Sequence, residues 1–249
     1  MKIIVKNLAT EYSDEGTGHV LLFLHGWQDT LHTFDALCVS LVKTHRVVRL
    51  DLPGFGHTDT PKQVWTLDEY IAFVDEFIKK LQLDVDTIVG HSFGGRIIIK
   101  GASTKKIHTK KIILIASAGI AQRQTLRTAT LKIIAKIGGI LLCVPPLFFW
   151  RDTLRRQFYS AIGSDYLSAG ALQKTFLNII AHDLSQYARM LSLPTLLIWG
   201  DHDIQTPLSD GKRLTKMIPG SHLDIISDTG HFVHKERPLE VLRTIQKFL

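Results

Sequence analysis

Short apolar runs alternate with segments of helical periodicity along most of the chain. The run at residues 19–24 is continuously apolar, which is typical of a strand buried on both faces of a sheet. The pattern predicts strands at 2–6, 9–13, 19–24, 45–50, 87–89, 111–116, 194–200 and 222–227, and helices at 31–44, 66–83, 93–103, 208–217 and 238–249. Such alternation predicts an α/β protein with a mostly parallel twisted sheet flanked by helices.

The helix predicted at 66–83 has the clearest signals. Thr66 is a candidate N-cap and Glu69 follows it by three residues, which is the spacing of a capping box. Apolar residues then recur with helical spacing and predict the buried face: Tyr70, Phe73, Val74, Phe77, Ile78 and Leu81.

The alternation stops after Gly119, and about seventy residues follow without a clear strand. We therefore predict a helical cap inserted at 119–190, between two parts of one core domain at 1–118 and 191–249. Residues 125–141 form a weakly amphipathic pattern with lysines on one side. We expect this helix to pack on the body or to form a lid over a substrate cavity, and contact with a membrane surface is the less favoured alternative.

Length and composition indicate a globular protein with a substantial core. The chain has 249 residues, of which 45% are hydrophobic and 21% are charged. The longest apolar stretch, 137–150, is too short to span a bilayer, and the start of the chain does not look like a signal peptide. Cys38 and Cys143 form neither a metal motif nor a disulfide framework, so we expect a reducing, cytoplasmic location.

The net charge of +7 is concentrated in one part of the chain. Residues 101–160 contain 11 Lys or Arg and one acid, which gives +10, whereas the remainder is −3. This segment could attract anionic partners, although a solvated basic face is the favoured interpretation. Nucleic acid is not an expected partner, because the basic residues are not interleaved with stacking aromatic residues. The sequence makes no prediction of oligomeric state.

One serine lies at a sharp corner between a predicted strand and a predicted helix. Residues 90–94 read Gly-His-Ser-Phe-Gly, a Gly-x-Ser-x-Gly pattern that exposes the Ser92 hydroxyl on a strained turn. The alternative is that this tight turn is purely structural and that Ser92 has no catalytic role. A serine nucleophile needs a base, a group that orients the base, and donors directed at the developing oxyanion.

The remaining parts of such a site follow other predicted strands. Asp203 and His231 come after the strands at 194–200 and 222–227, and Asp201 is the weaker alternative for the acid. The backbone N–H groups of Trp27 and Phe93 are candidates for the oxyanion hole. Two further histidines flank this centre, and we expect them to hold its loops by hydrogen bonds: His25 and His91.

The chain resembles the α/β-hydrolase family in five segments that occur in the family's order: HGW (25–27), DLPGFGHT (51–58), VGHSFGG (89–95), WGDHDIQTP (199–207) and GHFVHKERP (230–238). The resemblance implies an α/β-hydrolase fold with a helical cap. It also implies that Ser92 is the nucleophile, His231 the general base and Asp203 the acid. In the same way, it assigns the oxyanion hole to the backbone of Trp27 and Phe93.

These residues predict a serine hydrolase that cleaves carboxylic esters through an acyl-enzyme, without a cofactor. No metal is expected, because neither 201–203 nor the pair His231 and His234 has a usual zinc spacing. A pocket for an apolar acyl group is predicted from four residues: His25, Phe148, Phe149 and Trp150. The alternatives are hydrolysis of a carbon–carbon bond, lactone or thioester on the same triad, or a non-catalytic binding or signalling protein with this fold.

Overall fold

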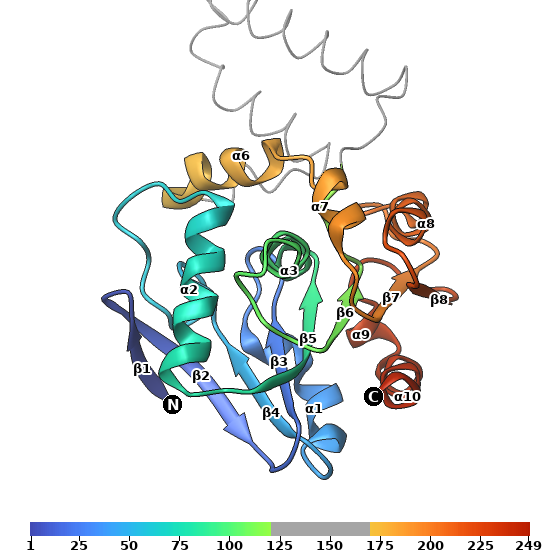
Figure 1. Ribbon diagram of the computed structural model, residues 1–249, viewed down its shortest axis with the longest axis horizontal. Coiled ribbons are helices and arrows are strands. Elements are labelled where there is room, and N and C mark those ends of the chain that lie inside the picture. Colours follow the sequence, from blue (N-terminus) through green and yellow to red (C-terminus); the bar gives the residue numbers. More distant parts are fainter. Residues whose placement is uncertain (121–169) are drawn as a thin grey trace, which may run out of the picture.

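The computed structural model describes residues 1–120 and 170–249, which form one eight-stranded sheet with helices on both faces (Figure 1). The strand order is β1-β2-β4-β3-β5-β6-β7-β8. Pairs β1–β2 and β2–β4 are antiparallel, and every other neighbouring pair is parallel. The strands are β1 Lys2–Val5, β2 Leu8–Glu15, β3 Val20–Leu24, β4 Arg46–Leu50, β5 Val85–His91, β6 Lys111–Ile115, β7 Thr195–Gly200 and β8 His222–Ile226. The mostly parallel sheet predicted from the sequence is confirmed.

Strand β3 lies at the centre of the molecule. All five of its residues are buried, and it pairs with β4 on one side and with β5 on the other. Successive side chains of a strand point to opposite faces, so Leu22 and Leu24 enter one core cluster while Leu21 and Phe23 enter the other. The continuous apolar run at 19–24 therefore supplies both cores at once.

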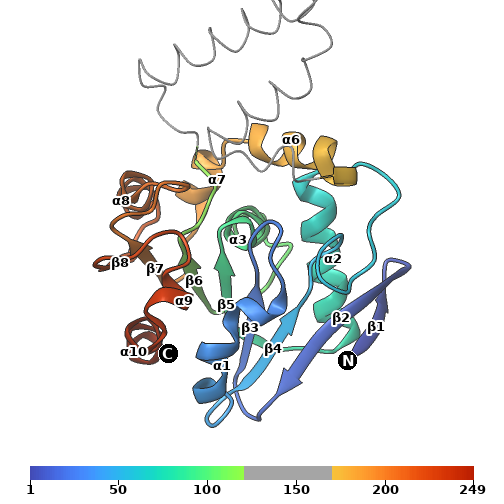
Figure 2. The same ribbon diagram turned by 180° about the vertical axis from the view of Figure 1, so that it is seen from behind.

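The helices divide between these two cores (Figures 1 and 2). Helices α2, α3, α7 and α8 pack into the first cluster, and α1, α9 and α10 pack into the second. The bounds are η1 Leu31–Phe34, α1 Asp35–Leu41, α2 Leu67–Lys80, α3 Phe93–Ser103, η3 Gly170–Leu172, α6 Gln173–Ala181, α7 Ser185–Met190, α8 Leu208–Met217, α9 Val233–Glu236 and α10 Pro238–Phe248.

Helix α2 begins with the predicted capping box. The Thr66 side chain accepts a hydrogen bond from the backbone of Asp68 at 3.2 Å, and the backbone N–H of Thr66 donates to Glu69 at 2.6 Å. These bonds satisfy amide groups that have no partner within the helix. The prediction for residues 31–44 was less accurate, because this segment begins as the 3-10 turn η1 and its α-helix ends at Leu41.

The described part of the predicted cap is helical. Residues 170–190 form η3, α6 and α7, and α6 lies beyond the carboxyl ends of the central strands (Figure 1). Arg96 of α3 fixes this segment, because its guanidinium donates to the carbonyl oxygens of Ile179 and His182. The predicted helix at 125–141 lies outside the described residues. Within the described ranges, no helix is long and apolar enough to cross a membrane.

Candidate active site

Ser92 occupies the turn between β5 and α3 in a backbone conformation that is unusual for a residue with a side chain. Its φ is +48° and its ψ is −105°. Such a conformation is costly and persists only where the surrounding structure enforces it. Here the Ser92 N–H donates to the carbonyl oxygen of Ile115 at 3.1 Å. A Cβ atom on Gly90 would lie only 2.7 Å from the backbone nitrogen of Gly95, so this close approach of strand and helix requires glycine.

His231 and Asp203 meet beyond the ends of β8 and β7. The Nδ1 atom of His231 lies 2.9 Å from Oδ2 of Asp203, and both side chains are buried. Since a carboxylate only accepts, Nδ1 carries the proton, and Nε2 keeps the lone pair when the ring is neutral. Asp203 is held in turn by the backbone N–H groups of Gln205 and Thr206, each 2.9 Å from Oδ1.

The structure places Asp203 rather than Asp201 against His231. The Thr206 hydroxyl adds a third donor, 2.8 Å from Oδ2 of Asp203. Asp201 instead accepts from the backbone N–H of Thr229 at 3.3 Å. Three donors therefore hold the carboxylate of Asp203 in place against His231.

His91 joins the serine turn to the loop that carries His231. Its Nε2 lies 3.1 Å from the carbonyl oxygen of His231, and the two ring centroids are 4.8 Å apart. His91 immediately precedes Ser92 in the chain. The contact therefore brings the turn that carries Ser92 next to the loop that carries His231, although the two residues lie more than a hundred positions apart in the chain.

The loop after β3 lies against the other side of the serine turn. The Gly94 N–H donates to the carbonyl oxygen of His25 at 3.1 Å, and a Cβ on Gly26 would lie 3.5 Å from Cβ of Ser92. Trp27 follows Gly26, and Phe93 follows Ser92. The two backbone segments proposed to donate to an oxyanion thus lie next to the candidate nucleophile.

His25 holds this loop from behind. Its Nε2 accepts from the backbone N–H of Leu52 at 2.8 Å, so the proton lies on Nδ1, which donates to the carbonyl oxygen of Gly26 at 2.7 Å. Burial lowers the pKa of His25 and keeps the ring neutral. Both nitrogens of the side chain are engaged in supporting the loop, as the flanking position predicted.

An aromatic cluster surrounds Trp27. Its ring centroid lies 4.8 Å from that of Phe55, 5.4 Å from Phe93 and 5.1 Å from Phe176 of α6. The sequence had not indicated Phe55 and Phe176 as site residues, although Phe55 belongs to the DLPGFGHT segment. Three predicted pocket residues lie outside the described part of the chain: Phe148, Phe149 and Trp150.

A strained serine after β5, together with a buried His–Asp pair beyond the last two strands, is the arrangement used by hydrolases with an open α/β sheet. Residues 21–244 match the alpha/beta hydrolase family, and the chain belongs to this family. As a member of this family, the protein is a hydrolase.

Two curated relatives align with nearly the whole chain. The Bacillus subtilis hydrolase YugF is 25% identical over 258 residues, which cover 98% of this chain and 94% of YugF. The 2-hydroxy-6-oxo-2,4-heptadienoate hydrolase of Pseudomonas putida is 22% identical and covers 99% of this chain and 95% of the relative. Among solved structures, a membrane phospholipase A has the same fold, with a TM-score of 0.78, 22% identity and coverage of 100% and 84%.

Proposed function

We propose that this protein is a serine hydrolase that cleaves carboxylic esters through an acyl-enzyme. The observation that carries the proposal is the buried contact of 2.9 Å between His231 and Asp203, on a loop that His91 ties to the strained turn of Ser92. A hydroxyl on such a turn, a base and an orienting acid are the three parts that acyl transfer requires.

In the proposed reaction, Oγ of Ser92 attacks the ester carbonyl while Nε2 of His231 takes its proton. The N–H groups of Trp27 and Phe93 stabilise the oxyanion, and fixed backbone donors need no reorganisation for this task. The C–O bond then breaks, and His231 returns the proton to the departing alcohol. Water repeats the sequence on the acyl-enzyme and releases the carboxylic acid and free Ser92.

An apolar acyl group is the proposed substrate feature. The aromatic cluster of Trp27, Phe55, Phe93 and Phe176 supports this proposal, because it places apolar surface beside the proposed oxyanion donors. A polar acyl group would lose hydrogen bonds to water on entering such surroundings. The contribution of the predicted pocket residues at 148–150 remains part of the proposal.

The test combines turnover with covalent labelling. Ser92→Ala should abolish hydrolysis of p-nitrophenyl esters and labelling by a fluorophosphonate probe, whereas Ser103→Ala at the other end of α3 should retain both. Hydrolysis by folded Ser92→Ala protein would refute the assignment. A folded wild-type protein that is neither labelled nor active would instead favour a non-catalytic binding protein.

The same three residues are compatible with other acyl and carbon–carbon bond hydrolyses. The Pseudomonas putida relative is a dienoate hydrolase, and an enol-lactonase from Burkholderia xenovorans shares the fold with a TM-score of 0.74. A panel of esters, lactones, thioesters and a 2-hydroxy-6-oxo-dienoate separates these activities. If lactones, thioesters or the dienoate gave a higher kcat/KM than the esters, the class with the highest value would replace esters as the proposed substrate.

A further inference from the structure

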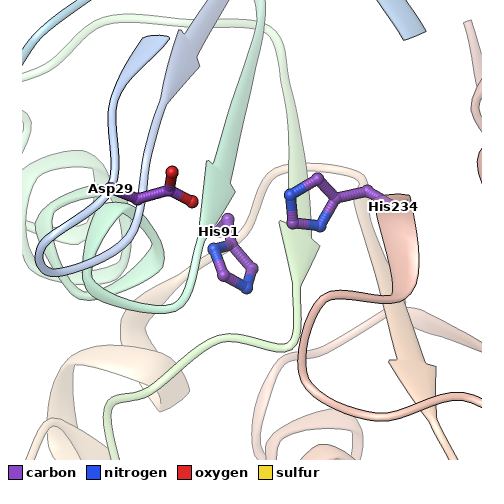
Figure 3. A group of neighbouring side chains, drawn as sticks. All are labelled: Asp29, His91 and His234. Carbon is purple, nitrogen blue, oxygen red and sulfur yellow. The ribbon is translucent and has the colours of Figure 1, made fainter. Parts of the chain in front are cut away.

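Three side chains outside the proposed triad converge on one another (Figure 3). Asp29 comes from the loop after β3, His91 from the end of β5 and His234 from α9. The nitrogen and oxygen atoms that they offer lie within 4.8 Å of one another. Both imidazole rings are buried, and Asp29 is half-buried.

Each of the two histidines uses one ring nitrogen in a hydrogen bond, and the other nitrogen has no partner in the described part of the chain. His91 Nε2 must donate to the carbonyl oxygen of His231, 3.1 Å away, so Nδ1 of the neutral ring has a free lone pair. His234 Nε2 lies 2.9 Å from the hydroxyl of Thr33. The Nδ1 atoms of both rings are buried, and neither has a hydrogen-bond partner among residues 1–120 and 170–249. Burying a polar atom without a hydrogen-bond partner destabilises a fold, so these two atoms call for an explanation.

We propose that Asp29, His91 and His234 bind one divalent transition-metal ion of the zinc class. Two imidazoles and one carboxylate are a common ligand set for such ions. The outer hydrogen bonds fit as well, because a metal-binding histidine usually gives its second nitrogen to a carbonyl or another polar group. The carbonyl of His231 and the hydroxyl of Thr33 occupy these outer positions.

The surroundings of the site are consistent with a bound ion. A Cβ on Gly26 would lie 2.8 Å from Nδ1 of His91, so any larger residue at this position would crowd this nitrogen. Burial lowers the pKa of His91 well below 6.5 and that of His234 to about 3, which keeps both rings neutral, as metal binding requires. Zinc–ligand bonds of about 2.0–2.2 Å would draw the three groups closer, and the half-buried Asp29 has the most freedom to move.

Lys235 is the competitor for this site. Its Nζ lies 3.4 Å from both carboxylate oxygens of Asp29, and its side chain is 45% exposed. The ammonium group therefore neutralises the carboxylate that the ion needs, and it can move into solvent when the ion binds. Removal of this positive charge should strengthen metal binding, which gives the proposal a test by gain of affinity.

Equilibrium dialysis of the full-length protein against Zn²⁺, and visible absorption with Co²⁺, test the site directly. We expect one ion per chain, with affinity reduced at least about tenfold in Asp29→Asn and His234→Gln and increased in Lys235→Met. Asn keeps the size of Asp29 and an oxygen for the hydrogen bond from the Thr30 N–H, so this variant should fold. Exposed His222 supplies the matched control, because His222→Gln should bind as the wild type does.

Equal affinity in the wild type, Asp29→Asn and Lys235→Met would overturn the proposal, as would loss of the ion in His222→Gln alone. Circular dichroism of each variant shows whether it is folded before the comparison is made. The readout is the bound ion itself. Failure here would leave ester hydrolysis by Ser92 untouched, and failure of hydrolysis would leave the metal site untouched.

Discussion

His91 and His231 are 140 residues apart in the chain, yet Nε2 of His91 donates to the carbonyl oxygen of His231 at 3.1 Å. The bond runs to the backbone of His231, so it fixes the position of the loop and leaves the imidazole of His231 free to pair with Asp203. His91 is thus placed to act as a positioning residue for the proposed general base.

Replacement of His91 should weaken catalysis more than binding. We expect His91→Ala to lower kcat by roughly 10- to 100-fold with a small change in KM, because a displacement of about 1 Å can cost this much. His91→Gln keeps a donor on the side chain and should recover part of the loss. The measurement is the pH profile of kcat, which should shift if His231 loses its position. An unchanged profile and an unchanged kcat in folded His91→Ala would contradict the role.

The choice between two neighbouring acids can be tested by isosteric amides. Asp203→Asn should lower kcat about 10⁴-fold, the loss typical when the acid of a triad can no longer hold the correct tautomer of its histidine. Asp201→Asn serves as the control, since Asp201 bonds the backbone of Thr229 instead. Ester hydrolysis under saturating substrate measures both. Equal losses in the two variants would argue against Asp203 as the orienting acid.

The Thr206 side chain contacts the carboxylate of Asp203. Its hydroxyl lies 2.8 Å from Oδ2 of Asp203 and 3.1 Å from the carbonyl oxygen of Ala116. Thr206→Val keeps the shape and removes the hydroxyl, so the free energy of unfolding should fall by about 1 kcal/mol and kcat by about tenfold. Thr206→Ser should remain close to the wild type. Urea unfolding and steady-state kinetics on the three proteins test this prediction, and a Ser variant as impaired as Val would point to packing instead.

The sequence predicted the sheet well, because its signals are local and physical. A buried parallel strand must be apolar throughout, and 19–24 could be recognised for this reason. The capping box at Thr66 and Glu69 depends on residues only three positions apart. The short helix α9, Val233–Glu236, has too few residues for a periodic pattern and was not predicted.

The candidate site could be proposed from the sequence where its residues follow the ends of strands, and not where it depends on packing across the fold. Ser92 comes directly after β5, and Asp203 and His231 lie in the loops that follow β7 and β8, so all three could be proposed from their positions after predicted strands. Phe176 reaches Trp27 only because α6 folds back over the sheet. Asp29, His91 and His234 come from three segments that are distant in the sequence, and their spacing matches no known motif. This group can therefore be recognised only in the folded structure.

Buried neutral histidines make stability depend on pH in a defined direction. Burial lowers the pKa of His234 from 6.5 to about 3. Between these values the unfolded chain binds a proton that the folded chain does not, so the free energy of unfolding falls as the pH falls. One such group contributes about 1.4 kcal/mol per pH unit in this range. Urea unfolding at pH 7, 6, 5 and 4 should therefore show a steep loss of stability in the wild type.

The His234→Gln variant isolates the contribution of this residue. It should be less stable than the wild type at pH 7, because a buried ring is replaced, and the difference should shrink by about 1.4 kcal/mol for each unit below pH 6.5. His222→Gln should retain the wild-type slope, since His222 is exposed on β8. A constant difference between the wild type and His234→Gln across this range would show that His234 takes up its proton at the same pH in the folded and unfolded chains, and that its burial does not keep the ring neutral.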